Sequence, residues 1–181
     1  TITTLDSGII TSPVFAGHYL VWAKQSPGSS NPSFVFADAT TLKLEAVPAE
    51  LRSPREIANL AGSPGSLVWT GSPRTSSPST GKWFVDDLAS GTIKTYGALN
   101  HYFQFPQLAG PYLVWFGADK NSIVDLRTGN GFDIALPGGV EAAGDTIVIV
   151  RVSAPKGNVS QSRISVLHPS QLSPLGPCVQ P

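Results

Sequence analysis

The chain has 181 residues, and its 12 basic side chains balance 12 acidic ones, so the formal net charge is zero. Only 13% of the residues are charged, too few for the basic surface of a nucleic-acid binder or of a protein adsorbed to a membrane. We therefore exclude nucleic acid as a partner. Membrane insertion is excluded too, because no apolar run approaches the roughly 20 residues of a spanning helix.

The composition favours many short elements around one packed core. Hydrophobic residues make up 41% of the chain, while 18 glycines and 16 prolines favour turns over long helices. The single cysteine, Cys178, excludes a disulfide within the chain and a cysteine-based zinc site. The chain lacks methionine, so we expect that a leader was removed or that this is a piece of a longer protein.

A four-part repeat organises the chain. Each part opens with a brief segment ending in Ala-Gly, at Gly17, Gly62, Gly110 and, in a degraded copy, Gly144. The next apolar run reads Leu-Val-Trp in the first three parts and Ile-Val-Ile in the fourth. Two further short runs complete each part. In chain order, the expected strands are 13–15, 20–22, 34–38 and 42–47; 57–60, 67–69, 83–87 and 92–96; 105–108, 113–115, 123–125 and 132–136; and 140–142, 147–149, 164–168 and 171–175.

Turn signals separate the third and fourth expected strands. Asp38, Asp87 and Asp125 end the third run of three repeats, where an aspartate can bond the backbone two residues on and close a tight turn. In the first repeat the fourth strand alternates, with Leu42 and Leu44 expected on one face of the sheet. Strands with one wet face and one apolar face are thus expected at the end of each repeat.

The gradient from a small-residue first strand to apolar middle strands and a half-wet last strand is typical of a propeller blade. We predict an all-β fold, a β-propeller of about four four-stranded blades, forming one domain over residues 1–181 with blades at 7–50, 51–98, 99–137 and 138–176. The chain either closes as a small propeller, with residues 1–5 adding a strand to the last blade, or forms part of a larger one. An all-β sandwich is the remaining alternative.

The stretch from Ala109 to Gly129 resembles one blade of the TolB-like propeller repeats of secreted and cell-surface proteins. It runs from a glycine turn through a Leu-Val-Trp strand to an Asp-Leu-Arg-Thr-Gly turn. The first two repeats match it with insertions, whereas the fourth has Ile149 in place of tryptophan and His168-Pro in place of Asp-Leu. The resemblance implies a propeller fold and a place outside the cytoplasm, and it implies no reaction.

Catalytic patterns are absent from the sequence. His18, His101 and His168 have no serine or cysteine partner at a recognised spacing, and Asp86 and Asp87 must point to opposite faces of one strand. We therefore predict no catalytic residue, no metal site and no cofactor. The recurring Trp22, Trp69 and Trp115 are assigned to packing between blades rather than to sugar binding, and Trp83, in the next strand, is assigned to the core.

Two groups of residues are binding candidates. Asn59, Gln107 and Glu141 are expected at comparable places on first strands beside the channel, where they could hold buried water, which we favour, or an ion or a small polar ligand. The second group lies in the loops of one face of the propeller, where function on a rigid scaffold is often found. It consists of Arg55, Glu56, His101, Tyr102 and Lys120.

These observations predict a non-enzymatic binding or scaffold module of a secreted, periplasmic or cell-surface protein that holds a protein or peptide, or alternatively a glycan, through its loops. The alternative is an accessory propeller of a larger hydrolase, a peptidase or a glycosidase, that filters substrate. A propeller glycosidase itself would need two carboxylates at the channel, for which Glu141 and Glu56 are the candidates.

Overall fold

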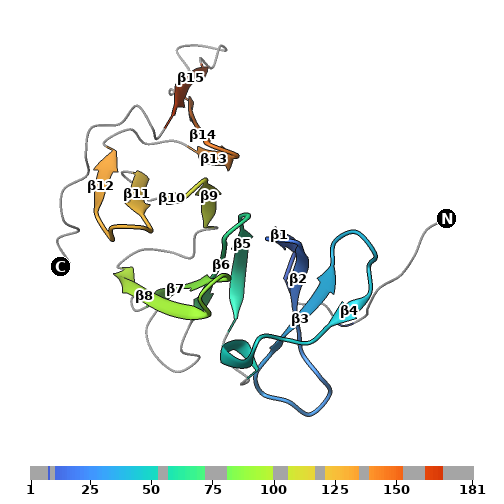
Figure 1. Cartoon of the computed structure of the whole chain (residues 1–181). Coiled ribbons are helices and arrows are strands. Elements are labelled where there is room, and N and C mark those ends of the chain that lie inside the picture. Colours follow the sequence, from blue (N-terminus) through green and yellow to red (C-terminus); the bar gives the residue numbers. More distant parts are fainter. Residues whose placement is uncertain are drawn as a thin grey trace. The chain divides into compact units, whose positions relative to one another are not determined.

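The computed structural model describes residues 8, 11–52, 57–71, 81–99, 106–116, 121–134, 139–152 and 162–168, most of which lie in strands or in the turns between them. The strands form four antiparallel sheets (Figure 1). Sheet 1 contains β1 (Val14–Ala16), β2 (Tyr19–Lys24), β3 (Ser33–Asp38) and β4 (Leu44–Glu45); sheet 2 contains β5 (Ala58–Gly62), β6 (Ser66–Gly71), β7 (Gly81–Asp87) and β8 (Thr92–Leu99); sheet 3 contains β9 (Gln107–Ala109), β10 (Tyr112–Phe116), β11 (Asn121–Asp125) and β12 (Gly131–Ile134); and sheet 4 contains β13 (Gly139–Ala143), β14 (Thr146–Val152) and β15 (Ser162–Leu167).

The chain divides into two compact units. The first, Thr1–Asn100, holds sheets 1 and 2, with the short 3-10 helix η1 (Ala49–Leu51) between them. The second, His101–Pro181, holds sheets 3 and 4. Two expected strands, residues 1–5 and 171–175, lie outside the described residues.

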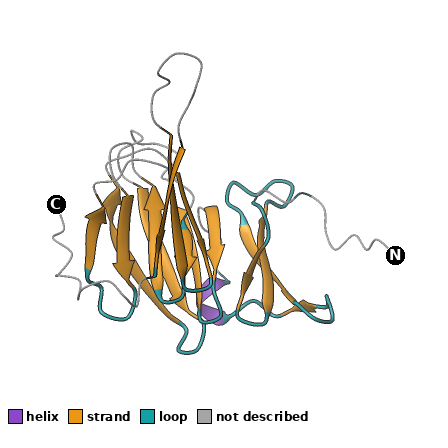
Figure 2. Cartoon of the chain, turned by 90° about the horizontal axis from the view of Figure 1, so that it is seen from above, coloured by secondary structure: helices purple, strands orange, loops and turns teal. Residues whose placement is uncertain are grey.

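Within every sheet the strands follow one another in chain order, each antiparallel to the last. Figure 2 shows the strands joined at their ends by turns and loops. Because the chain reverses at each step, the turns from the first to the second strand and from the third to the fourth lie at one end of a sheet, here termed the turn end. The connection from the second to the third strand and the link to the next sheet lie at the opposite end, here termed the loop end. Each sheet therefore has its short turns at one end and its longer connections at the other.

Aspartates close the turns after the third strands, as the sequence predicts. In each case the carboxylate Oδ1 accepts hydrogen bonds from backbone N–H groups that follow it in the turn. These bonds run from Thr40 and Thr41 to Asp38, from Ala89 and Ser90 to Asp87, and from Arg127 to Asp125, at donor–acceptor distances of 2.6–3.2 Å. The structural role assigned to these aspartates is confirmed.

A main-chain hydrogen bond joins the two turns of a sheet. The residue after each turn aspartate donates its N–H to the carbonyl of the second residue of the first turn, from Ala39 to His18 (2.8 Å), from Leu88 to Gly65 (3.1 Å) and from Leu126 to Pro111 (2.9 Å). His18, Gly65 and Pro111 are therefore equivalent positions. In sheet 2 this places the turn at Pro64 and Gly65, two residues later than the Ala-Gly pattern indicates.

Gly62 has a different role from the turn glycines Gly17 and Gly110. A Cβ on Gly62 would overlap the carbonyl oxygen of Phe15 and lie 2.7 Å from its carbonyl carbon. Strand β5 therefore approaches β1 too closely for any side chain at this position. Beside it, the N–H of Gly17 donates to the carbonyl of Ser63 at 2.8 Å, which links the two sheets of the first unit through the backbone.

Each sheet has two faces, defined by its second strand. The valine face carries the central valine of Leu-Val-Trp and its equivalents, and the tryptophan face carries the residues on either side of that valine. In the first unit the valine face of sheet 1, with Val21 and Phe36, packs against the tryptophan face of sheet 2, with Leu67 and Trp69.

The second unit repeats this arrangement. The valine face of sheet 3, with Val114 and Ile123, packs against the tryptophan face of sheet 4, with Ile147 and Ile149. The same pairing of unlike faces therefore builds the core of both units, as expected for blades stacked in one direction.

The tryptophans follow the predicted packing with one difference. Trp22, Trp69 and Trp83 are fully buried. Trp69 meets Phe34 edge-on, with ring centroids 5.2 Å apart, and stacks on Phe84 at 5.4 Å, so it fills the space between sheets 1 and 2. Trp115, in contrast, is half-buried, which is less than the shared sequence pattern predicts.

The fourth strand of sheet 1 also departs from expectation. Strand β4 covers only Leu44 and Glu45, both exposed. Leu42 does not belong to it, because its φ of 57° places it in the left-handed region as part of the turn. Leu42 and Leu44 are 41% and 63% exposed, so the expected apolar face is not buried here.

Candidate functional site

Five of the predicted binding residues belong to connections between strands and lie outside the described residues: Arg55, Glu56, His101, Tyr102 and Lys120. By sequence position they fall in connections that start and finish at loop ends, between η1 and β5, between β8 and β9, and between β10 and β11. The predicted role of these residues stays a prediction.

Gln107 and Glu141 are brought together in the second unit. The side-chain Nε2 of Gln107, on β9, donates to Oε2 of Glu141, on β13, at 3.1 Å. The other end of the same amide accepts, since Oε1 of Gln107 receives the N–H of Ala142 at 3.2 Å. One side chain therefore connects the first strands of sheets 3 and 4 through both a backbone group and a carboxylate.

The location of these bonds explains why a glutamine is useful there. Strand β13 pairs with β14 on one side, and its other edge presents backbone groups that no strand of its own sheet can satisfy. A glutamine has both an acceptor and a donor, so it can take the N–H of Ala142 and still hold the carboxylate of Glu141. Glu141 remains exposed, and a polar ligand could reach it.

Asn59 does not occupy the place equivalent to Gln107 and Glu141, contrary to the prediction. The valine opposite Gln107 is Val114 and the valine opposite Glu141 is Val148, but Val68 of sheet 2 pairs with Ala61. Since the true turn of sheet 2 comes two residues after Gly62, every position of β5 is offset by two. Asn59 instead lies at a bulge in β5, with a φ of 43° that asparagine tolerates better than most residues.

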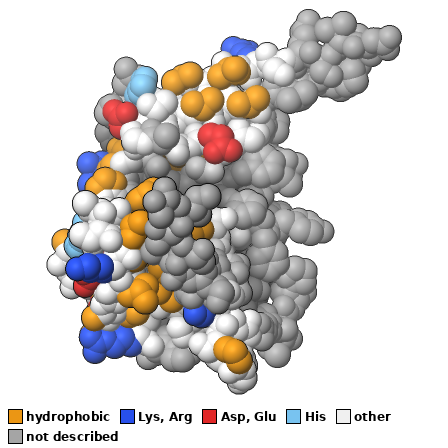
Figure 3. Space-filling view, turned by 90° about the vertical axis from the view of Figure 1, so that its right-hand side faces the viewer, with side chains coloured by type: hydrophobic (Ala, Val, Ile, Leu, Met, Phe, Trp, Pro, Cys, Tyr) orange, Lys and Arg blue, Asp and Glu red, His pale blue; other side chains and the backbone are white. Residues whose placement is uncertain are grey.

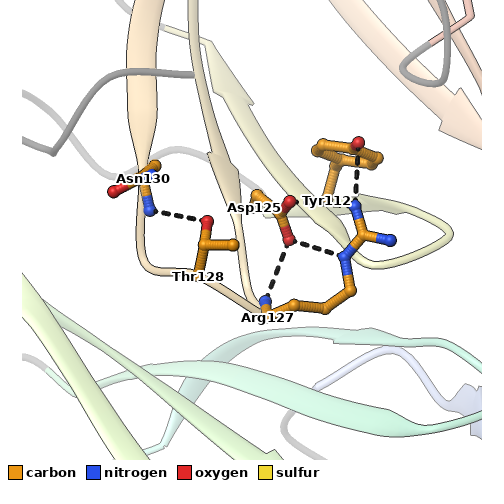
Figure 4. Close-up of polar contacts among 5 residues, drawn as sticks. All are labelled: Tyr112, Asp125, Arg127, Thr128 and Asn130. Atoms are coloured by element: carbon orange, nitrogen blue, oxygen red, sulfur yellow. Dashed lines mark hydrogen bonds and ion pairs between the residues drawn. The ribbon is translucent and has the colours of Figure 1, made fainter. Parts of the chain in front are cut away.

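A cluster at the turn end of sheet 3, which the sequence analysis missed, joins Tyr112, Asp125 and Arg127 (Figure 4). The Arg127 guanidinium bonds both carboxylate oxygens of Asp125 at 2.9 Å and donates to the Tyr112 hydroxyl at 3.0 Å. Its Cζ lies 5.3 Å from the centroid of the Tyr112 ring. Tyr112 and Asp125 are opposite each other in β10 and β11, a cross-strand relation that the linear sequence does not display.

The cluster fixes the charge states of its members. Hydrogen bonds from the Arg127 side chain hold the pKa of Asp125 below its ordinary value, although partial burial acts in the opposite direction. The same carboxylate raises the pKa of Arg127. In sheet 1, hydrogen bonds from the backbone and hydroxyl of Thr41 lower the pKa of Asp38. All these carboxylates are ionised at neutral pH and serve the turns.

The remaining candidates for chemistry are dispersed. Among the described residues, no three His, Cys, Asp or Glu side chains gather where they could hold a metal ion. His18 is exposed and lies against Tyr19, with ring centroids 3.8 Å apart. Asp86 is buried whereas Asp87 is exposed, so the two carboxylates point to opposite faces as predicted. In the described part of the chain, no helix is long and apolar enough to cross a membrane.

Several solved structures share this fold. The chain superposes on TolB from Acinetobacter baumannii with a TM-score of 0.57 and 15% identity, over 86% of this chain and 40% of that one. It matches the β-propeller domain of the trilobed protease from Pyrococcus furiosus with a TM-score of 0.59 and 12% identity, over 86% and 53%. The acylaminoacyl peptidase of Pyrococcus horikoshii gives 0.55 and 12%, over 87% and 30%.

These similarities confirm the predicted fold class. Four antiparallel sheets in chain order, together with propeller neighbours, establish an all-β protein of β-propeller type. No protein-family model and no curated protein sequence matches the chain. The chain spans about half or less of the length of the structures named above, and at such low identity the likeness extends to the fold alone.

Proposed function

We propose that the chain is a non-enzymatic binding or scaffold module of an extracytoplasmic protein, and that it holds a protein or peptide through its loop ends. The supporting observation is the contrast between the two ends of the sheets. At the turn end the polar side chains of Asp38, Asp87 and Asp125 are used to close the turns of their own sheets. Recognition is therefore assigned to the other end.

The loop ends carry the variation expected of a recognition surface. The connection from β2 to β3 runs from Lys24 to Ser33, whereas that from β10 to β11 runs from Phe116 to Asn121. Variable connections on a constant frame are the usual way in which such scaffolds acquire binding specificity. Arg55 and Lys120 would supply positive charge for an acidic partner, and rim charges of this kind act mainly on the association rate.

A charge-reversal experiment tests this assignment. The double variant Arg55→Glu/Lys120→Glu is compared with Lys43→Glu, which reverses an exposed charge at the turn end of sheet 1. Proteins captured from the extracellular fraction are identified, and their affinities are then measured at several salt concentrations. We expect about tenfold weaker binding and a smaller salt dependence for the double variant, and no change for Lys43→Glu. Equal binding by all three proteins would contradict the proposal.

The second candidate is an accessory propeller of a larger hydrolase. It is favoured by the neighbours whose names include a protease and a peptidase, of whose chains this one covers 53% and 30%. A reading frame that joins these residues to a hydrolase domain, and a change in that enzyme's size selectivity when they are removed, would support it. If the chain instead binds a small polar ligand at Glu141, binding should be lost in the variant Glu141→Gln and retained in the double variant Arg55→Glu/Lys120→Glu.

Three further expectations stay predictions. They are the location outside the cytoplasm, a glycan as the alternative partner, and the organisation of residues 1–181 as a single domain. Cell fractionation followed by immunodetection tests the first of them directly, and recovery of the protein with cytoplasmic markers would contradict it.

A further inference from the structure

Charged side chains do not gather into a large patch of one sign among the described residues of the face shown in Figure 3. Basic and acidic groups are scattered there among hydrophobic and polar ones, so charge does not mark a further ligand on this face. The pair Asn130–Gly131, where β12 begins, instead carries reactive chemistry in the main chain itself. It is the only place in the sequence where an asparagine precedes a glycine.

Gly131 departs from the repeat. In sheets 1 to 3 the turn aspartate pairs with the first residue after the turn, and these pairs are Asp38 with Lys43, Asp87 with Thr92, and Asp125 with Asn130. The residue that comes next is Leu44 in sheet 1 and Ile93 in sheet 2, but Gly131 in sheet 3. Sheet 3 alone of the three therefore lacks a side chain that would shield the main-chain nitrogen at this position.

The main-chain nitrogen of Gly131 points away from β11. In an antiparallel ladder, hydrogen-bonded pairs alternate with pairs that are not hydrogen-bonded. The N–H of Asp125 donates to the carbonyl of Asn130 at 2.8 Å, so the next pair, Val124 with Gly131, is not hydrogen-bonded. Strand β12 is an edge of sheet 3, and among the described strands none of this sheet lies on its outer side. The N–H of Gly131 is therefore not committed to the ladder.

The contacts of Asn130 favour an attack by this nitrogen. The main-chain N–H of Asn130 donates to Thr128 Oγ1 at 3.2 Å, and its carbonyl accepts the bond from Asp125 (Figure 4). The bond from Asp125 withdraws electron density from the peptide group between Asn130 and Gly131, which makes the N–H of that group easier to deprotonate. Within the described part of the chain, no hydrogen bond holds the side-chain amide of Asn130, so its Cγ can turn toward the nitrogen.

We propose that Asn130 is a site of spontaneous modification to aspartate and isoaspartate in the folded protein. The main-chain nitrogen of Gly131 attacks Cγ of Asn130, a carbon–nitrogen bond forms, and the side-chain nitrogen leaves as ammonia. The proton of the Gly131 amide leaves with the ammonia. One water molecule then opens the resulting succinimide ring at either carbonyl, and nothing is oxidised or reduced.

Isoaspartate changes the start of β12. The main chain then continues through Cγ of residue 130, so an extra methylene group enters it before β12. The carbonyl that accepts from Asp125 becomes part of a carboxylate outside the main chain. Strand β12 pairs with β11 from Val124 to Asn121, and the inserted group disturbs this register. The modification therefore weakens the pairing of β12 and leaves the loop ends, to which binding is assigned, unchanged.

Incubation of the folded protein, followed by peptide mapping with mass spectrometry, tests the site. We expect aspartate and isoaspartate to accumulate at Asn130, and to do so faster at alkaline pH, because the nitrogen must lose its proton. Asn31, which precedes a proline, and the buried Asn121 are internal references and should stay intact. Gly131→Ile, which copies Ile93 of sheet 2, should slow the reaction by about tenfold or more, since a β-branched side chain shields the nitrogen. Circular dichroism verifies that this variant folds.

The same incubation in concentrated urea separates the effect of the fold from that of the Asn-Gly sequence. Because the nitrogen of Gly131 is uncommitted in the fold, the rate at Asn130 should stay within about tenfold of its rate in the unfolded chain, whereas Asn121 should be protected until the protein unfolds. An Asn130 that reacts in urea but stays intact in the folded protein would overturn the proposal. Equal rates for wild type and Gly131→Ile would overturn it as well.

Discussion

Replacing Gly62 by alanine should destabilise the first unit far more than a glycine-to-alanine change usually does. The new Cβ would overlap the Phe15 carbonyl oxygen, lie 2.7 Å from the carbonyl carbon of Phe15 and 3.1 Å from the Cβ of Ala16. Ordinary carbon–carbon contact begins at about 3.5 Å, so β1 and β5 must separate by roughly 1 Å. Such a shift would also stretch the backbone bond from Gly17 to Ser63, now 2.8 Å long.

The expected loss is about 3 kcal/mol of unfolding free energy, at the upper end of what overpacking causes. Gly65→Ala is the matched control, because a Cβ there meets nothing within 4 Å and the residue has no positive φ. It should be neutral or stabilise by up to about 1 kcal/mol through the unfolded state. Urea unfolding followed by circular dichroism measures both. Equal stabilities for the two variants would refute the close approach of β1 and β5.

Three further predictions concern packing, a turn and pH. Trp69→Ala should cost about 3–5 kcal/mol in unfolding free energy because the indole is fully buried between Phe34 and Phe84, while Trp115→Ala should cost clearly less; similar losses in urea unfolding would contradict this difference. Asp87→Ala should cost about 1 kcal/mol through the loss of two turn hydrogen bonds, and Asp87→Asn should retain most of that stability, as thermal unfolding can establish. Because the pKa of Asp125 is lowered in the folded state, its stabilising effect is present above its unfolded pKa of about 3.9 and is lost as the pH falls through the folded value. The stability difference between wild type and Asp125→Asn should therefore shrink below about pH 4, and a difference that grows instead would show that the ion pair with Arg127 has been misassigned.

The features that the sequence predicts well are those determined by short stretches of chain. Alternating apolar runs and an aspartate that bonds the next few amides are local patterns, so the strands and the turns at Asp38, Asp87 and Asp125 follow from them. The buried Trp22 and Trp69 are also predicted, because both belong to a run that is apolar throughout.

The features that it predicts poorly depend on neighbouring strands. The Ala-Gly pair of sheet 2 matches the turn pattern, but Gly62 is required by the approach of Phe15 from another sheet, and the turn comes later. Because β5 is offset by two residues from the sequence pattern, Asn59 does not lie at the position equivalent to Gln107 and Glu141 that the sequence predicts. The bond between Gln107 and Glu141 joins two sheets, and only the comparable positions of the two residues on first strands hinted at it.

The main-chain bond that links the two turns of a sheet has a consequence for divergence among repeats. Its acceptors are the carbonyls of a histidine, a glycine and a proline, at His18, Gly65 and Pro111, and its donors are the N–H groups of an alanine and two leucines. No side chain takes part, so the bond itself places no requirement on residue type at these six sites, except that a proline cannot act as the donor. Repeats that are fastened through the main chain alone can therefore share this bond although their residues at the six sites differ.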